Sequence, residues 1–185
     1  THTSPIIAIS GEKENITADI VFVMTEDGEE NIIGFTNNIT NPEGGTHVTG
    51  FKSGFAKLIN SYARNELGLL KEKDANLSGA DIRSGMQAII SVKHPDPQFE
   101  GQTKTKLSNT DVTKAVDDIV KEQLTVYFDR NYDVLKDICD RAVSLSKQKA
   151  LEKSKINLNK FSFEGNGKLA KQESNDSSKC EIFIV

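Results

Sequence analysis

The 185-residue sequence predicts an α+β fold in which helices cover one face of a mostly antiparallel sheet. Three observations support this prediction. Apolar residues alternate in steps of two within residues 4–39, as they do in β-strands. They recur at helical spacing within residues 51–62 and again within residues 112–145. A further strand pattern, residues 86–93, separates the two helical regions.

Three strands are expected in the first part of the chain. Residues 4–10 and 16–25 have strand patterns, and the polar turn GEKEN joins them. The dipeptide Asp27-Gly28 marks a second turn, after which residues 31–39 return as a third strand. Together the three strands predict an antiparallel meander.

Five apolar residues share one face of the first predicted helix. They are Phe51, Phe55, Leu58, Ile59 and Tyr62. Gly68 is expected to end this helix. A polar connection then leads to the strand at residues 86–93.

Two more helical stripes follow that strand. The pattern Ser108-x-x-Asp111 resembles a capping box and is expected to begin the first of them. A second stripe runs from Leu135 to Leu145. Apolar residues stop after about Leu151 while lysines continue, so the last helix is expected to be long and to project from the body.

The domain organisation follows from these patterns. Residues 1–155 are expected to form one domain. Residues 156–179, rich in Asn, Gly, Ser and Lys, are expected to be a linker. Residues 180–185, CEIFIV, form an apolar strand pattern with no closing turn. Because both ends look cut, the chain is expected to be a piece of a larger protein.

Composition narrows the function classes. A formal net charge of −4 argues against a generally basic nucleic-acid binder, but residues 141–160 hold six basic residues against one acidic residue. This local excess faces either a phosphate backbone or solvent. Cys139 and Cys180 have no partners at metal-ligand spacing and are expected to be reduced thiols. With no recognisable signal peptide or membrane span, a soluble, cytoplasmic protein is expected.

Two loops carry residues suited to an anion. The segment EGGTH, residues 43–47, has two interpretations: either its backbone amides bind an anion, or its glycines only allow a tight turn. In PDPQFEGQTKTKL, residues 95–107, Lys104 and Lys106 alternate with threonines and point to the side of Gln102 if the chain is extended. This edge either complements a phosphate or is simply solvated. No complete active site is recognisable by motif.

Three segments resemble the B subunit of bacterial DNA gyrase or its topoisomerase IV counterpart. They are NIIGFTNNITNPEGGTHVTGF, DIRSGMQAIISVKHPDPQFEGQTKTKL and CEIFIV. The resemblance runs from about Ser4 to Leu151 and resumes at GKLA, residues 167–170. It implies a transducer domain between a GHKL-type ATPase domain and a metal-binding Toprim domain, whose first strand is CEIFIV. It also implies a ribosomal-protein-like sheet, a left-handed βαβ crossover and a long C-terminal helix.

The resemblance implies roles for individual residues. In that family the QTK loop reaches the ATPase domain, where its lysine contacts the γ-phosphate of ATP. The matching residue is Lys104, with Gln102 beside it. The segment is thereby expected to sense ATP and to couple hydrolysis to domain motion during DNA strand passage. Alone, it is expected to be inactive.

The resemblance also implies partners and cofactors. They are DNA, a gyrase A-type cleavage subunit and a second B subunit in a homodimer, with ATP bound mainly by the ATPase domain and Mg²⁺ bound outside this segment. Four lysines near the end of the last helix are expected to face DNA. They are Lys147, Lys149, Lys153 and Lys155.

The sequence departs from the family at EGNGKLAKQESN, where members commonly carry an LPGKLADC-like run. Two other interpretations stay open at this point. One is the coupling domain of another GHKL ATPase of the MutL type, and the other is a stand-alone nucleic-acid-binding module with salt-dependent affinity. The sequence does not separate gyrase from topoisomerase IV.

Overall fold

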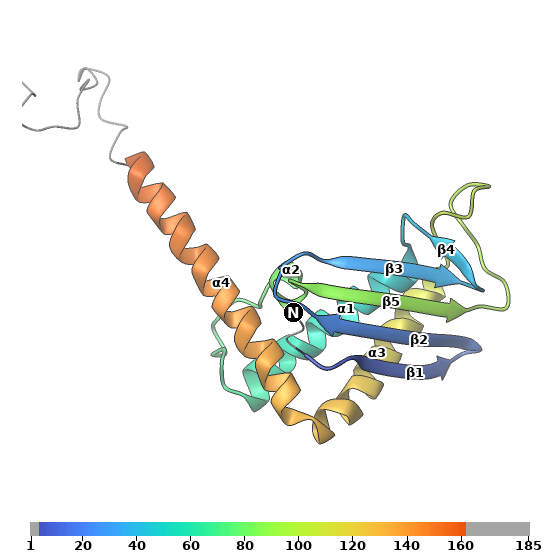
Figure 1. Ribbon diagram of the computed structural model, residues 1–185, viewed down its shortest axis with the longest axis horizontal. Coiled ribbons are helices and arrows are strands. Elements are labelled where there is room, and N and C mark those ends of the chain that lie inside the picture. The colour runs from blue at the N-terminus through green and yellow to red at the C-terminus, as the bar shows by residue number, and fades with distance from the viewer. Residues whose placement is uncertain (1–3, 162–185) are drawn as a thin grey trace, which may run out of the picture. The chain divides into compact units, whose positions relative to one another are not determined.

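The computed structural model describes residues 4–161 (Figure 1). Its strands are β1 (Ile7–Lys13), β2 (Ile16–Met24), β3 (Asn31–Thr36), β4 (Ile39–Asn41) and β5 (Met86–Lys93). Its helices are α1 (Thr46–Ser61), the π-helical turn η1 (Tyr62–Glu66), α2 (Gly79–Ile82), α3 (Thr110–Arg130) and α4 (Tyr132–Phe161). The α+β class expected from the sequence is confirmed.

The chain divides into two compact units, Thr1–Ser146 and Lys147–Val185. The predicted linker was placed from residue 156, but residues 156–161 are helical. No glycine or proline interrupts them, so nothing in their sequence ends the helix. Residues 162–185, which hold most of the predicted linker, Cys180 and the last predicted strand, lie outside the described residues.

The sheet order is β1-β2-β5-β3-β4. β2 pairs antiparallel with both β1 and β5, β4 pairs antiparallel with β3, and β3 is parallel to β5. The predicted meander is therefore wrong at its third strand, because β5 lies between β2 and β3. β5 has apolar residues on both faces, with Ile90 buried and Ile89 half exposed, which suits it to the centre of the sheet.

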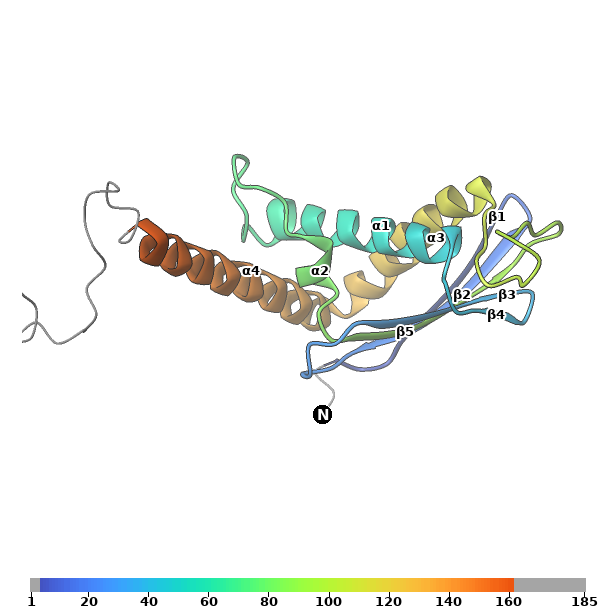
Figure 2. The ribbon, with the colours of Figure 1, turned by 90° about the horizontal axis from the view of Figure 1, so that it is seen from above.

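The connection from β3 to β5 passes through α1. In Figure 1 both strands point the same way and α1 lies behind the sheet; Figure 2 shows the helices on that one face. Passing from β3 behind the sheet to β5 turns left-handed. Parallel crossovers are right-handed in nearly all proteins, so this hand is a specific property of the fold.

Two turns are formed by residues other than glycine. Glu14 and Asn15 have φ angles of 52° and 65°, so β1 runs on to Lys13 and a two-residue turn replaces the longer turn predicted. Asn37 and Asn38, at 48° and 68°, make a second tight turn. This turn adds the short strand β4, which the sequence did not indicate.

The core lies between the sheet and the helices α1 and α3. Its centre is a cluster of three aromatic rings, in which Phe22 of β2 contacts Phe51 and Phe55 of α1 at centroid distances of 5.9 and 5.4 Å. The predicted stripe of α1 is confirmed, since Phe51, Phe55 and Ile59 are fully buried. These rings fix α1 on the sheet and therefore fix where α1 begins.

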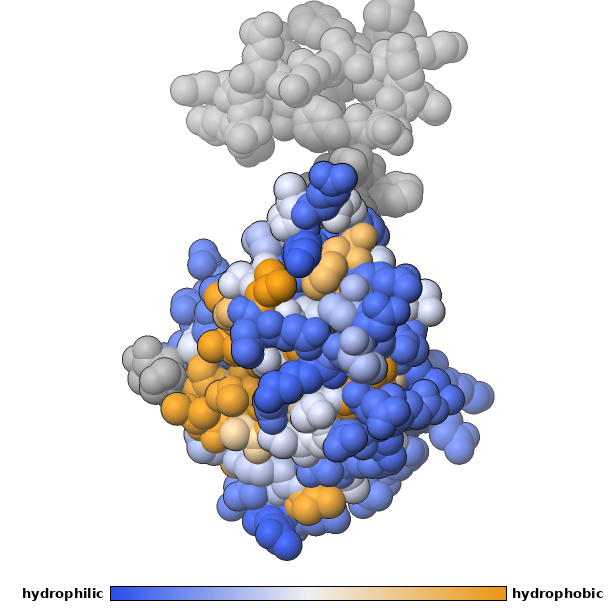
Figure 3. All heavy atoms as spheres, turned by 90° about the vertical axis from the view of Figure 1, so that its right-hand side faces the viewer, coloured by the Kyte–Doolittle hydropathy of each residue, from blue (hydrophilic) through white to orange (hydrophobic). Residues whose placement is uncertain are grey.

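The opposite face of the sheet carries exposed apolar side chains. Val21, Ile33 and Ile89 are between 38% and 50% exposed, and Ile6 is 69% exposed. Apolar residues gather toward the left of Figure 3, where this face is seen edge-on. The sheet thus has helices on one face only, as the sequence predicts.

The helices α1 and α3 approach closely because α1 has glycines at the contact. A Cβ at Gly50 would lie 2.5 Å from the carbonyl oxygen of Thr113. Nearby, the buried Asp117 of α3 pairs with Lys57 of α1 and with Lys121. The contact therefore combines close backbone packing with a paired charge.

Replacing Gly50 by alanine should destabilise the protein. The new methyl group would collide with the backbone of α3, and overpacking of this kind costs about 1–3 kcal/mol, against a gain in helix propensity of about 1 kcal/mol. Chemical denaturation measures the difference. Ser53→Ala on the same helix is the control and should be neutral or slightly stabilising; equal stability of the two variants would contradict the close contact.

Candidate functional site

The candidate site is the loop of residues 94–109, between β5 and α3, at the end of the sheet where β4 lies (Figure 1). Its first residue is tied to the β3–β4 turn. Asn37 donates from Nδ2 to the carbonyl oxygen of His94 (2.9 Å), and the His94 amide donates to Asn37 Oδ1 (2.9 Å). The start of the loop is therefore fixed to the sheet.

The buried His94 side chain joins the loop to α3. Its Nδ1 accepts from the amide of Asp96 (2.9 Å) and therefore carries no proton. Nε2 then carries the proton and donates to Asp111 Oδ2 (3.0 Å), which lowers the pKa of Asp111. The sequence indicated no partner for His94, because its partners lie across the loop rather than at motif spacing.

The end of the loop is held by Asn109. Its Oδ1 accepts from the amide of Gln98 (2.6 Å), and its Nδ2 donates to the carbonyl oxygen of Asp96 (3.2 Å). Asn109 is also the N-cap residue of α3, and its side chain makes no capping bond. The predicted capping box is wrong, since the amide of Ser108 donates instead to the carbonyl oxygen of Gln98 (2.9 Å).

The middle of the loop pairs with the segment that leads into α1. The Glu43 amide donates to the carbonyl oxygen of Thr105 (3.1 Å). Leu107 is bonded twice, donating to the carbonyl oxygen of Gly44 (3.1 Å) and accepting from the amide of Thr46 (3.1 Å). These bonds give the loop an ordered backbone although it contains neither helix nor strand.

The two glycines of EGGTH are explained by this pairing. Gly45 has a φ of 138°, and a Cβ there would lie 2.4 Å from the carbonyl oxygen of Leu107. Gly44 has a φ of 72°, and its amide donates to the carbonyl oxygen of Asn41. The amides of this segment are largely engaged within the protein, which favours the turn over the anion site.

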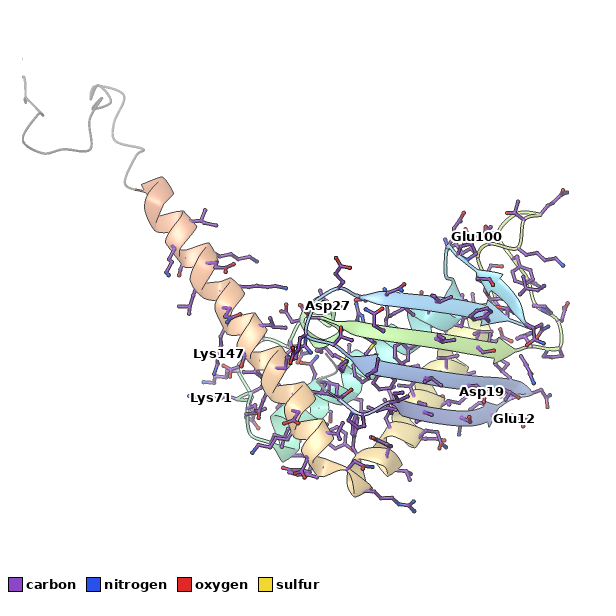
Figure 4. All side chains as sticks on the ribbon, viewed as in Figure 1. Glu12, Asp19, Asp27, Lys71, Glu100 and Lys147 are labelled. Atoms are coloured by element: carbon purple, nitrogen blue, oxygen red, sulfur yellow. The ribbon has the colours of Figure 1, made fainter. Side chains whose placement is uncertain are left out.

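The two lysines of the loop differ in their surroundings. Lys106 Nζ lies 3.0 Å from Glu100 Oε2, in an ion pair within the loop; Figure 4 labels Glu100 at this end of the sheet. Lys104 is exposed, and among residues 4–161 its ammonium group has no hydrogen-bond or ion-pair partner. Gln102 is likewise exposed and unpartnered within the described chain. Lys104 is thus available to an anion, and Lys106 is already paired.

The backbone at Lys104 is left-handed. Its φ of 56° is uncommon for a residue with a side chain and costs about 1–3 kcal/mol unless the surroundings hold it. The extended chain that would point Lys104 and Lys106 to one side is therefore interrupted. Asn41, a buried residue that the sequence did not single out, donates to the carbonyl oxygen of Lys104 (2.9 Å).

His47 is buried beside Gly34 of β3, at the start of α1. Neither ring nitrogen has a hydrogen-bond partner among the residues that the structure describes. Burial lowers the pKa of His47 to about 4, so the ring is neutral near pH 7. His47 is a packed residue of the core and offers no base to the surface.

The four lysines expected to face DNA lie on α4 and are exposed. With about 3.6 residues per turn, Lys149 and Lys153 share one side of the helix, while Lys147, labelled in Figure 4, and Lys155 lie on others. Further back on α4, Cys139 is buried, which raises the pKa of its thiol to about 12. That thiol is unreactive.

Neither a cluster of metal-ligating side chains nor a membrane-spanning helix is found in the part of the chain that the structure describes. Within residues 4–161, no group of three His, Cys, Asp or Glu side chains is arranged to hold a metal ion. None of the helices described is long and apolar enough to cross a membrane.

The architecture matches known ATPase and transducer folds. It superimposes on the 43K ATPase domain of Thermus thermophilus gyrase B with a TM-score of 0.77 and 31% sequence identity, covering 84% of this chain and 41% of that one. A model of the family DNA gyrase B matches residues 1–157. The chain belongs to the DNA gyrase B family.

Curated relatives agree with this assignment. The chain is 44% identical to the B subunit of a type 2 topoisomerase of Aquifex aeolicus and 42% identical to a DNA gyrase B subunit of Enterococcus faecalis. Each alignment covers 97% of this chain. The chain spans only 23% and 28% of the lengths of these relatives.

His47 should make stability depend on pH. The unfolded chain binds a proton at this residue near pH 6.5 and the folded chain only near pH 4. The contribution of His47 to the free energy of unfolding should therefore be fully present above pH 6.5. It should fall on acidification by at most about 1.4 kcal/mol per pH unit. His47→Leu should remove that part of the loss. Urea unfolding of both proteins at several pH values tests this; parallel pH profiles would contradict it.

Proposed function

We propose that this segment is the transducer of a type II DNA topoisomerase B subunit and that Lys104 contacts the γ-phosphate of ATP held by an ATPase domain. The observation that carries the proposal is an exposed ammonium group on an ordered loop, unpaired within residues 4–161. Gln102, two residues earlier and also exposed, is proposed to assist at the same phosphate. Family membership and the likeness to a gyrase ATPase domain structure support the proposal.

The chemistry suits the residue. When bound, ATP supplies a γ-phosphoryl group whose negative charge is spread over its oxygens during transfer. A lysine held against those oxygens stabilises that charge. The described residues supply only a small part of an ATP site. Most groups that bind ATP are therefore proposed to lie in the ATPase domain, and Mg²⁺ is proposed to bind outside this segment.

The attachments of the loop suggest how the contact would be transmitted. The loop is bonded to the β3–β4 turn through Asn37, to the start of α1 through Leu107 and to α3 through His94. A force on Lys104 therefore acts on the whole first unit. Loss of the γ-phosphate would release this attraction and allow one rigid body to rotate against another.

The wider assignment follows from the family and is part of the proposal. The transducer is proposed to occupy residues 1–155, with α4 running on to Phe161 before the linker that ends at residue 179, and the first Toprim strand is proposed at 180–185. The whole protein is proposed to act on DNA in the cytoplasm, as a homodimer of B subunits with a gyrase A-type cleavage subunit. Relatives named as gyrase and type 2 topoisomerase B subunits support these partners and disfavour a MutL-type ATPase.

Lys104→Ala should impair ATP hydrolysis in the longer protein that joins this segment to its ATPase domain. Losing an aligned charge at the γ-phosphate should cost about 2–4 kcal/mol, or roughly a 30- to 1,000-fold fall in turnover. Steady-state ATPase assays and nucleotide-binding titrations measure the effect, and nucleotide binding should be largely kept.

Lys106→Ala is the matched comparison. It removes an equal charge two residues away, but this charge is already paired with Glu100, so turnover should fall by less than about threefold. The 185-residue segment alone provides a baseline and should show no ATP hydrolysis. Equal losses for the two lysines, or an active isolated segment, would argue against the sensor role.

The DNA contact of α4 is proposed to use one side of the helix. Replacing both Lys149 and Lys153 by alanine should make the negative slope of log affinity against log salt shallower by about 1.8, since each lost phosphate contact removes about 0.9. Replacing Lys147 and Lys155, which lie on other sides, should change the slope less. DNA binding by the longer protein at several salt concentrations decides, and unchanged slopes in both variants would mean that these lysines do not contact DNA.

A further inference from the structure

The backbone carbonyl of Lys104 is held by two buried polar side chains that are hydrogen-bonded in series. Asn41, the last residue of β4, is 1% exposed, and Thr36, the last residue of β3, is fully buried. The Thr36 hydroxyl donates to Asn41 Oδ1 (2.7 Å), and Asn41 Nδ2 donates to the carbonyl oxygen of Lys104 (2.9 Å). The β3–β4 hairpin is thereby joined directly to the residue proposed to touch ATP.

The orientation of the Asn41 amide is determined by its partners. A carbonyl oxygen only accepts hydrogen bonds, so the Asn41 atom next to Lys104 must be the nitrogen. The amide oxygen then faces Thr36, whose hydroxyl can donate to it. The carbonyl of Lys104 thus selects the orientation of the amide, and the Thr36 hydroxyl holds the amide oxygen at the other end.

This chain helps Lys104 to keep a left-handed backbone, because it holds the peptide group that follows Lys104. Such a conformation persists in a residue with a side chain only where neighbouring groups hold it. The Asn41 bond fixes the carbonyl of Lys104, and the Glu43 amide fixes the next carbonyl, that of Thr105. The peptide group on the C-terminal side of Lys104 is thereby fixed, as is the one after Thr105, which limits the directions in which the Lys104 side chain leaves the loop.

We propose that Asn41, held in place by its hydrogen bond with Thr36, is a positioning residue for Lys104 that helps to direct the ammonium group; this rests on the γ-phosphate contact proposed above. Asn41 itself touches no nucleotide. It acts on turnover through the backbone of Lys104, and it links the sheet to the sensor by a route separate from His94 and α3.

Asn41→Asp tests the proposal in the longer protein. The carboxylate keeps the size of the side chain and its acceptor for Thr36, but it cannot donate to Lys104. We expect kcat for ATP to fall about 5- to 30-fold, the worth of one buried hydrogen bond, and KM to change by less than about twofold. Thr40→Ala, an exposed neighbour on β4, is the control and should leave both constants unchanged.

Thr36→Val provides a second variant if a buried carboxylate prevents folding. Valine matches the shape of threonine but cannot donate to Asn41 Oδ1 and so holds the side chain less firmly; kcat should fall in the same direction by a smaller factor. Thr36→Ser restores the hydroxyl and should recover most of the activity. A loss shared by the Val and Ser variants would indicate a packing defect and would overturn the proposed role.

Coupling to Lys104 separates positioning from a general structural effect. In a Lys104→Ala background, Asn41→Asp should cause no further loss of kcat, because the group that it positions is gone. Losses that multiply would show that Asn41 acts independently and would overturn the proposal. If Lys104→Ala alone keeps full activity, the proposed sensor role fails first, and positioning for catalysis fails with it.

Hydrogen exchange gives a readout that does not depend on ATP hydrolysis. Asn41→Asp should speed exchange at the Leu107 amide, whose bond to Gly44 depends on the loop staying in place, while amides in the centre of α3 keep their protection. Unchanged exchange in the loop would show that Asn41 does not hold it and would overturn the proposal even if Lys104 proves essential.

Discussion

The arrangement of the candidate site depends on the pairing of Leu107 with the start of α1. Leu107 donates to the carbonyl oxygen of Gly44 and accepts from the amide of Thr46, and its side chain is buried. Only a residue without a side chain fits between these bonds, which is why Gly45 lies there. Because the rings of Phe51 and Phe55 fix α1 on the sheet, the loop takes its position from the core.

The sequence predicts the class of the fold and the buried faces, but the order of the strands is not contained in its periodicity. Alternation in β2 says which side chains point inward, yet it is silent on whether β3 or β5 lies beside β2. The hand of the crossover follows from the family resemblance alone. β4 escaped prediction because three residues are too few to show a period, and it exists because Asn37 and Asn38 adopt positive φ angles.

The site could be predicted in part. The motif pointed to Lys104, and the composition of the loop suggested an anion, but the difference between Lys104 and Lys106 depends on where Glu100 lies once the loop has folded. Asn41 and Lys104 are 63 residues apart in the chain, so no local pattern connects them. Contacts of this kind are set by the tertiary structure, and a single sequence gives no signal for them.

The central place of β5 has a consequence for how the chain folds. The hairpins β1–β2 and β3–β4 are local and close short loops, so each can form early. Neither pairs with the other in the sheet; β5, which follows both hairpins in the chain, enters between them. Folding of the unit should therefore be limited by these long-range pairings, and a nascent chain that ends before Met86 leaves unpaired the two strand edges, of β2 and β3, that β5 covers in the finished sheet.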